Sequence, residues 1–181
     1  MLHQLTCRTF KRDNSMTDTT YTIPATADIG HVHLNVSNLN RALTFYCGVL
    51  GFTLVTRLGD GAAFVAAGNY HHHIGLNTWH TANASPAPDG HTGLYHLAVR
   101  YPSRPDLAHA VQRVLNARIP IHGATDHGVS ESVYLADPDG NGIELTCDRP
   151  ISEWPRNARG EPQMFAGKAL DIAALLGVGL Q

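Results

Sequence analysis

Cysteine, charge and long apolar runs are all scarce in this chain of 181 residues. The three cysteines, Cys7, Cys47 and Cys147, show no paired spacing, which argues against a secreted disulfide framework and a cysteine-rich zinc site. Only 15% of residues are charged and the net charge is -2, so we expect neither nucleic acid nor a membrane surface as partner. No run of about 18 apolar residues is present, so we expect no membrane span.

Histidine is abundant by contrast, with 12 residues, and 43% of the chain is hydrophobic, enough for a packed core. Because histidine is the commonest metal ligand and a proton carrier near neutral pH, this excess raises the expectation of a functional site. Residues 1–28 are polar and lack the apolar segment of a signal peptide. We predict a flexible N-terminal extension there, with Met16 as an alternative start to Met1, and a cytoplasmic protein.

A pattern of one strand, one helix and three strands occurs twice. Residues 31–36 and 96–101 alternate polar and apolar side chains, and each segment is followed by apolar residues at helical spacing. Asn38 and Ser103 stand where N-caps are expected. The remaining strands are predicted at residues 53–57, 62–67 and 72–79, and at residues 119–121, 132–136 and 142–147.

These repeats predict an α+β fold of two βαβββ modules that form one curved eight-stranded sheet around a metal-binding cup. Module 1 spans residues 29–80 and module 2 spans residues 93–148, within a single domain of residues 29–150. Residues 151–181 form a tail with a short amphipathic helix at residues 170–176, which we expect to cover an apolar edge.

Strand alternation places three potential metal ligands on one face. His31, His96 and Glu144 each lie next to apolar strand residues that should pack on the helices, so their own side chains point the other way. Alone, each histidine is more simply a hydrogen-bonded residue at a strand end. At repeat-related positions, two imidazoles and one carboxylate form the facial triad that suits non-haem Fe(II).

Four segments carry a resemblance to a known family. These are residues 29–52, YHHHIGLNTW at 70–79, GLYHLAV at 93–99 and DHGVSESVYLADPDGNGIELT at 126–146. Together they resemble the vicinal oxygen chelate superfamily, which includes glyoxalase I, bleomycin-resistance proteins and extradiol dioxygenases. The second and fourth segments are similar to its catechol 2,3-dioxygenase branch. The resemblance implies that His31, His96 and Glu144 are the metal ligands.

The resemblance also implies catalytic roles. Tyr134, ten residues before Glu144 (144 − 134 = 10), and His127 match residues that act beside the metal in this branch. His72 matches the acid–base histidine, although plain alternation would place His73 on the cup face unless a β-bulge intervenes. We name His72 first and His73 as its alternative.

Each of these residues has a simpler reading. His127 could be merely solvated, Tyr134 could be a core aromatic residue, and the three consecutive histidines could be an adventitious metal tract. His33 and His73 are further candidates for lining the substrate site.

Gly75 favours ring cleavage over isomerisation. Superposing HIGL (73–76) on GIEL (142–145) places Gly75 opposite Glu144, where glyoxalase-I-like members usually have a fourth ligand. Three protein ligands leave neighbouring positions for a diol and O2.

We therefore expect an Fe(II)-dependent extradiol dioxygenase acting on a catechol-type diol, with Mn(II) as the alternative metal. By default symmetry we expect a homodimer. The alternatives are a glyoxalase-like metal-dependent lyase or isomerase, and a resistance-type protein that binds a ligand without catalysis.

Overall fold

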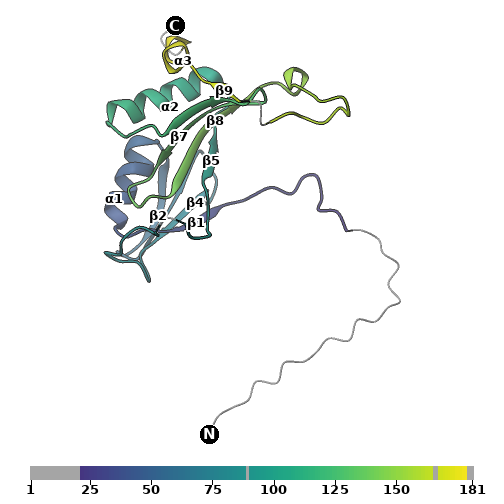
Figure 1. The fold of residues 1–181 in the computed structure, drawn as a ribbon. Helices are drawn as coiled ribbons and strands as arrows, with labels where there is room; N and C mark the ends of the chain where they lie inside the picture. Colours follow the sequence, from purple (N-terminus) through teal and green to yellow (C-terminus); the bar gives the residue numbers. More distant parts are fainter. Residues whose placement is uncertain (1–20, 89, 165–166, 179–181) are drawn as a thin grey trace, which may run out of the picture.

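The structure, a computed structural model, describes residues 21–88, 90–164 and 167–178. Its elements follow the order βαβββ twice (Figure 1), which confirms the predicted α+β class. Module 1 contains β1 (Val32–Asn35), α1 (Leu39–Leu43), the π-helix η1 (Thr44–Val49), β2 (Thr53–Leu58), β3 (Ala62–Ala66) and β4 (Ile74–Asn77). Module 2 contains β5 (Leu97–Arg100), α2 (Arg104–Asn116), β6 (Gly123–Asp126), β7 (Ser130–Ala136) and β8 (Gly142–Asp148). The elements after module 2 are η2 (Ile151–Glu153), β9 (Lys168–Ala169) and α3 (Ile172–Val178).

The strands form two hydrogen-bonded sheets where the sequence predicts one continuous sheet of eight. The first has the order β1-β4-β3-β2, and the second has the order β5-β8-β7-β6-β9. The edges of β1 and β5 do not pair with each other, and residues from both strands line a cavity between the modules. The short strand β9 extends the second sheet by pairing with β6.

The register supports the internal symmetry on which the position of Gly75 depends. In module 1, β1 runs parallel to β4 and His33 lies opposite Gly75. In module 2, β5 runs parallel to β8 and Ala98 lies opposite Glu144. Gly75 therefore occupies the position in module 1 that Glu144 occupies in module 2.

Local chemistry explains where the helices begin. The side chain of Asn38 accepts a hydrogen bond from the backbone N–H of Arg41 (3.0 Å), and that of Ser103 accepts one from Asp106 (3.3 Å). Both predicted N-caps are thus confirmed. Gly51 then turns the chain into β2 with a φ of 87°, a left-handed conformation that glycine adopts without strain.

The strand predicted at residues 119–121 is wrong. The backbone N–H of Ile119 donates to the carbonyl of Val114 (3.1 Å), so this segment closes the C-terminal end of α2. The strand lies further along the chain, in β6. Strand β4 is also shorter than predicted, since it begins only at Ile74, and His72 and His73 therefore precede it.

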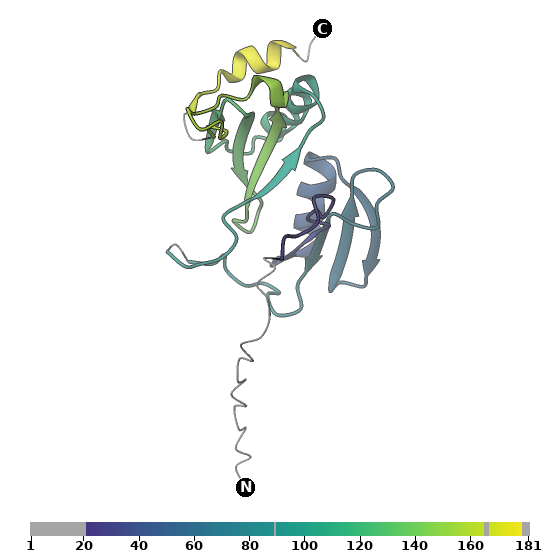
Figure 2. The same ribbon diagram turned by 90° about the vertical axis from the view of Figure 1, so that its right-hand side faces the viewer.

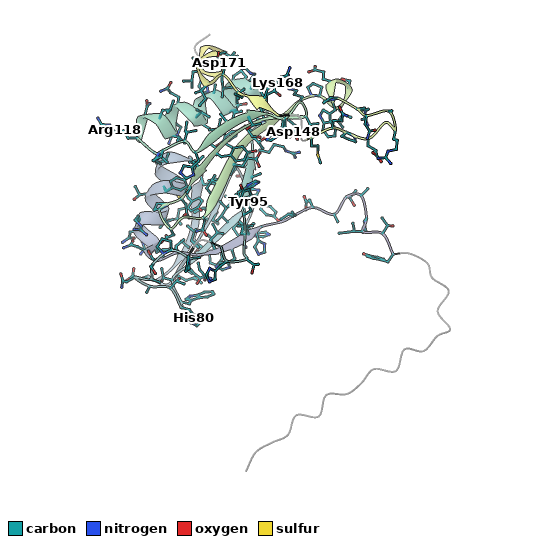
Figure 3. The ribbon with its side chains drawn as sticks, in the orientation of Figure 1. His80, Tyr95, Arg118, Asp148, Lys168 and Asp171 are labelled. Atoms are coloured by element: carbon teal, nitrogen blue, oxygen red, sulfur yellow. The ribbon has the colours of Figure 1, made fainter. Side chains whose placement is uncertain are left out.

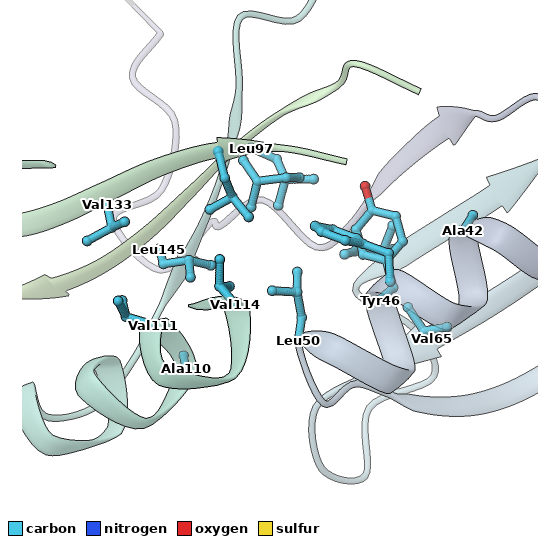
Figure 4. Packing of buried hydrophobic residues seen from close by; sticks show 14 of the residues in the cluster. Ala42, Tyr46, Leu50, Val65, Leu97, Ala110, Val111, Val114, Val133 and Leu145 are labelled. Carbon is cyan, nitrogen blue, oxygen red and sulfur yellow. The ribbon is translucent and has the colours of Figure 1, made fainter. Parts of the chain in front are cut away.

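One apolar core joins the two modules. Helices α1 and α2 cover the same side of the two sheets (Figure 1), and the modules lie side by side (Figure 2). Tyr46 and Leu50 from module 1 belong to the same buried cluster as Leu97, Val114 and Leu145 from module 2 (Figure 4). Helix α3 packs on α2 and buries Leu175 completely. No helix in the described part of the chain is long and apolar enough to cross a membrane.

Candidate metal centre

Module 2 brings together two of the three predicted metal ligands. His96 directly precedes β5 and Glu144 lies in β8, with the buried Ile143 and Leu145 on either side. The imidazole Nε2 of His96 lies 2.9 Å from Oε2 of Glu144, and the side chains are 30% and 13% exposed. Tyr95 (labelled in Figure 3) is exposed, and its ring packs 5.2 Å from that of His96.

The two predicted catalytic residues of module 2 extend this pair into a hydrogen-bonded chain. The hydroxyl of Tyr134 donates to Oε1 of Glu144 (3.2 Å), and His127 Nε2 lies 2.7 Å from the same hydroxyl oxygen. Since a phenol has one proton and gives it to Glu144, the imidazole of His127 is the donor to Tyr134. The order of the chain is His127, Tyr134, Glu144, His96.

Burial keeps Tyr134 in its protonated form. Desolvation raises the pKa of the Tyr134 hydroxyl, and the neighbouring Glu144 carboxylate raises it further. Near neutral pH, Tyr134 is therefore a hydrogen-bond donor.

The third predicted ligand, His31, lies in module 1 among other aromatic rings. Its imidazole ring is 4.4 Å from that of His72 and 6.4 Å from that of His71, measured between centroids. His72 also contacts Phe64 (5.0 Å), and Phe64 lies opposite Gly75 in the pairing of β3 with β4. His72 thus lies next to the predicted ligand without a β-bulge, because strand alternation does not extend to residues before Ile74.

His73 and His33 occupy different surroundings. Nδ1 of His73 accepts a hydrogen bond from the backbone N–H of Ala67 (3.3 Å), and His73 lines the cavity between the modules. The ring of His33 packs against those of Phe64 (5.8 Å) and Trp79 (5.6 Å) and covers Gly75.

The structure brings His31 and His96 to one cavity but does not bring His31 into a cluster with the His96–Glu144 pair. His31 and His96 both line the cavity of about 450 Å³ between the modules, together with apolar residues such as Leu94 and Leu97. Across residues 21–88, 90–164 and 167–178, no three potential ligands lie close enough to hold a metal ion. A site made from all three therefore requires His31 to approach the pair.

The donor set fits a divalent transition metal. Adjacent ligands of an octahedral ion with bonds of about 2.1 Å lie about 3 Å apart. His96 Nε2 and Glu144 Oε2 have about that separation, which is compatible with both atoms binding one ion. Two histidines with one carboxylate are the set that non-haem Fe(II) prefers.

Sequence reasoning missed two residues that the structure places near the predicted ones. Phe64 contacts the rings of both His33 and His72, and its only sequence signal is its position in a strand. Nδ1 of His71 lies 2.7 Å from Nδ1 of His72, a contact between neighbours in the histidine tract.

The paired βαβββ modules and the histidine–carboxylate pair on a sheet face are the features by which this chain can be compared with known families. The profile of the Glyoxalase/Bleomycin resistance protein/Dioxygenase superfamily matches residues 28–145, and the chain belongs to this superfamily. A glyoxalase/dioxygenase from Nostoc punctiforme has the same fold, with a TM-score of 0.58 and 23% identity; the match covers 73% of this chain and 100% of that one.

Curated relatives are named as dioxygenases. The chain is 40% identical over 149 residues to catechol-2,3-dioxygenase of Bacillus subtilis (strain 168), covering 82% of this chain and 50% of the relative. It is 32% identical over 124 residues to biphenyl-2,3-diol 1,2-dioxygenase 2 of Rhodococcus globerulus, covering 68% and 64%. The chain thus spans about half the length of the first relative and less than two thirds of the second.

Proposed function

We propose that this chain is an Fe(II)-dependent extradiol dioxygenase that opens the ring of a catechol-type diol with O2. The observation that carries the proposal is the Glu144 carboxylate held between the imidazole of His96 and the hydroxyl of Tyr134. The dioxygenase names of the relatives support the same chemistry. A cytoplasmic homodimer is part of this proposal.

His31, His96 and Glu144 would hold the metal, with Mn(II) as the alternative ion. When bound, Fe(II) supplies the redox chemistry that lets O2 react with a diol. The protein's part is to leave room for both substrates. Gly75 does so, because it puts no fourth carboxylate at the position equivalent to Glu144.

His72 would accept a proton from the diol. Burial lowers the pKa of its imidazole, and the nearby His31 lowers it further, so the neutral, proton-accepting form prevails at pH 7. Its contacts with His31 and Phe64 keep the ring beside the proposed metal site.

Tyr134 and His127 would bind the substrate oxygens. As a protonated donor, Tyr134 can turn its hydroxyl from Glu144 to a negatively charged oxygen, while His127 supplies a second donor behind it. The apolar residues around the cavity would exclude water from the ring of the diol.

Direct metal measurement on four variants tests the proposal. His31→Ala, His96→Ala and Glu144→Ala should each lose stoichiometric Fe(II) after anaerobic loading, and with it the yellow ring-opened product of catechol cleavage. The matched control is His80→Ala, since the exposed His80 lies at the end of the molecule opposite α3 (Figure 3). Full iron occupancy in any ligand variant would remove that residue from the site.

The same assay separates the alternatives. A metal-free protein that still binds an aromatic ligand would point to a resistance-type binding module. A metal-loaded protein that leaves catechols intact and isomerises a hemithioacetal would point to a glyoxalase-like enzyme.

A further inference from the structure

A polar contact joins the turn between β7 and β8 of module 2 to module 1. Oδ1 of Asp139 accepts hydrogen bonds from Nη2 of Arg41 (2.7 Å) and from the backbone N–H of Ser37 (3.1 Å). Oδ2 of Asp137 accepts one from the hydroxyl of Tyr46 (2.9 Å). We call these five residues the inter-module clamp.

The two carboxylates and the tyrosine of the clamp are buried, the Arg41 side chain is 50% exposed, and the hydrogen bonds are directional. The side chain of Asp139 is only 8% exposed, while Asp137 and Tyr46 are 5% and 0% exposed. Buried carboxylates are costly unless their hydrogen-bond partners are held in place, so this contact tolerates little displacement. Apolar packing across the same boundary is less directional than these hydrogen bonds.

The turn needs only one of its two carboxylates for its own structure. Oδ1 of Asp137 accepts from the backbone N–H groups of Asp139 and Asn141, both at 2.9 Å, and these bonds close the turn. The hydrogen bonds of the Asp139 carboxylate go to module 1 instead. Asp139 therefore serves the contact between the modules.

The clamp connects the two strands that lead to the proposed metal site. Ser37 follows β1, whose preceding residue is His31, and the clamped turn leads directly into β8, which carries Glu144. Among the described strands, none of module 1 pairs with one of module 2, so contacts outside the strand pairing determine how His31 lies relative to Glu144. A second directional contact, from the Arg113 guanidinium to the carbonyls of Gly48 and Val49 (both 2.7 Å), lies on α2 and η1.

We propose that the inter-module clamp holds module 1 beside the His96–Glu144 pair, so that only the exposed His31 side chain has to move to complete the site, and that the clamp thereby sets the metal affinity. The inference rests on the proposed function, in which all three side chains bind one ion. Arg41, Tyr46, Asp137 and Asp139 act as positioning residues and touch neither metal nor substrate.

The test uses a double variant of the full chain, Tyr46→Phe with Asp139→Ala. It removes the hydrogen bonds of Tyr46 and of the Asp139 carboxylate but leaves the apolar core between the modules. Tyr46→Phe alone is the milder variant if the double variant does not fold. The matched control is Asp60→Ala, because Asp60 forms an ion pair of the same 2.7 Å length with Arg57 inside module 1.

Two measurements are needed. Residual dipolar couplings on the metal-free protein report whether the modules share one orientation, and calorimetry with Mn(II) reports metal affinity. We expect both modules of the wild type and of Asp60→Ala to fit one alignment tensor. In the clamp variant each module should fit its own tensor, and its Mn(II) Kd should rise about 10- to 100-fold, as when residues that orient metal ligands are lost.

Unchanged orientation in a folded clamp variant would overturn the proposal, and so would changed orientation with unchanged Mn(II) affinity. If the wild type binds no Mn(II) or Fe(II), the proposed function fails. The dipolar couplings then still decide by themselves whether the clamp sets the arrangement of the modules.

Discussion

The space above Gly75 is filled by the ring of His33. A Cβ atom added at Gly75 would lie 2.9 Å from Cγ of His33 and 3.0 Å from two other atoms of that ring. In module 2 the residue paired with Glu144 is Ala98, whose small side chain stands where module 1 has the ring of His33. The ring of His33 therefore occupies the space that the first side-chain atom of any larger residue at position 75 would need.

This geometry defines a variant that converts the module 1 pair into the module 2 pair, His33→Ala with Gly75→Glu. The single change Gly75→Glu must displace the His33 ring, an overpacking that costs about 1–3 kcal/mol. Because His33 is exposed, its ring can move and the lower end applies. The double variant removes the clash and loses only the ring contacts of His33 with Phe64 and Trp79, about 1 kcal/mol of stability.

The double variant should bind divalent metal more tightly and cleave catechols more slowly. A fourth protein oxygen occupies a position that the diol or O2 requires, so affinity and turnover move in opposite directions. We expect the Mn(II) Kd to fall at least about tenfold, equivalent to about 1.4 kcal/mol. Calorimetry with Mn(II), catechol turnover after anaerobic Fe(II) loading, and a melting curve by circular dichroism measure the three quantities.

His33→Ala alone is the reference for this experiment, since it opens the space without adding a ligand, and its Mn(II) Kd should match that of the wild type. A folded double variant with the metal affinity and turnover of this reference would show that residue 75 does not face the metal. The case against a fourth ligand, and with it the preference for ring cleavage over a glyoxalase-like reaction, would then be lost.

Two further predictions concern single side chains. Tyr46→Phe should lower the free energy of unfolding by about 1.5 kcal/mol and Tm by about 3–6 °C, because it removes a buried hydrogen bond while Asp137 keeps its bond from Asn141. Burial and Asp137 raise the pKa of Tyr46 above its ordinary value of 10.0, so the folded state keeps a proton that the unfolded state loses. Wild-type stability should therefore fall by up to about 1.4 kcal/mol per pH unit above pH 10. Denaturant titrations at several pH values should find this component missing from Tyr46→Phe, and an equal alkaline decline in both proteins would refute the assignment. His72→Asn should keep metal binding but slow catechol turnover by about 10²–10⁴-fold, whereas a slow His73→Asn beside a normal His72→Asn would transfer the acid–base role to His73.

The module elements follow from local patterns, and this explains which predictions succeed. Asn38 and Ser103 cap their helices because an N-cap depends only on the first turn of the helix. The prediction of a strand at residues 119–121 is wrong because the backbone N–H of Ile119 bonds to Val114 at the end of α2. A short apolar segment has the same sequence pattern in either conformation. Strand β9 has two residues and exists only through its pairing with β6, so it has no sequence signal of its own.

The residues of the candidate site also divide into those with a local sequence signal and those without one. Alternation within β8 was enough to turn Glu144 away from the core, and the repeat led to His96. The conflict over His72 and His73 arose because alternation was extended past the start of β4 at Ile74. The role of Asp139 had no local signal at all, since an Asp-Pro-Asp-Gly run forms a turn whether or not its second carboxylate binds Arg41.

The two halves of the proposed site are held in place by different means. His96 and Glu144 belong to a chain of hydrogen bonds within one sheet, so module 2 preorganises its ligands without help. His31 is exposed and contacts the rings of His71 and His72, and its distance from the pair depends on how the modules meet. Because ligand geometry must be met to within about 0.5 Å, we expect changes at the module boundary to alter metal affinity while all three proposed ligands stay in place.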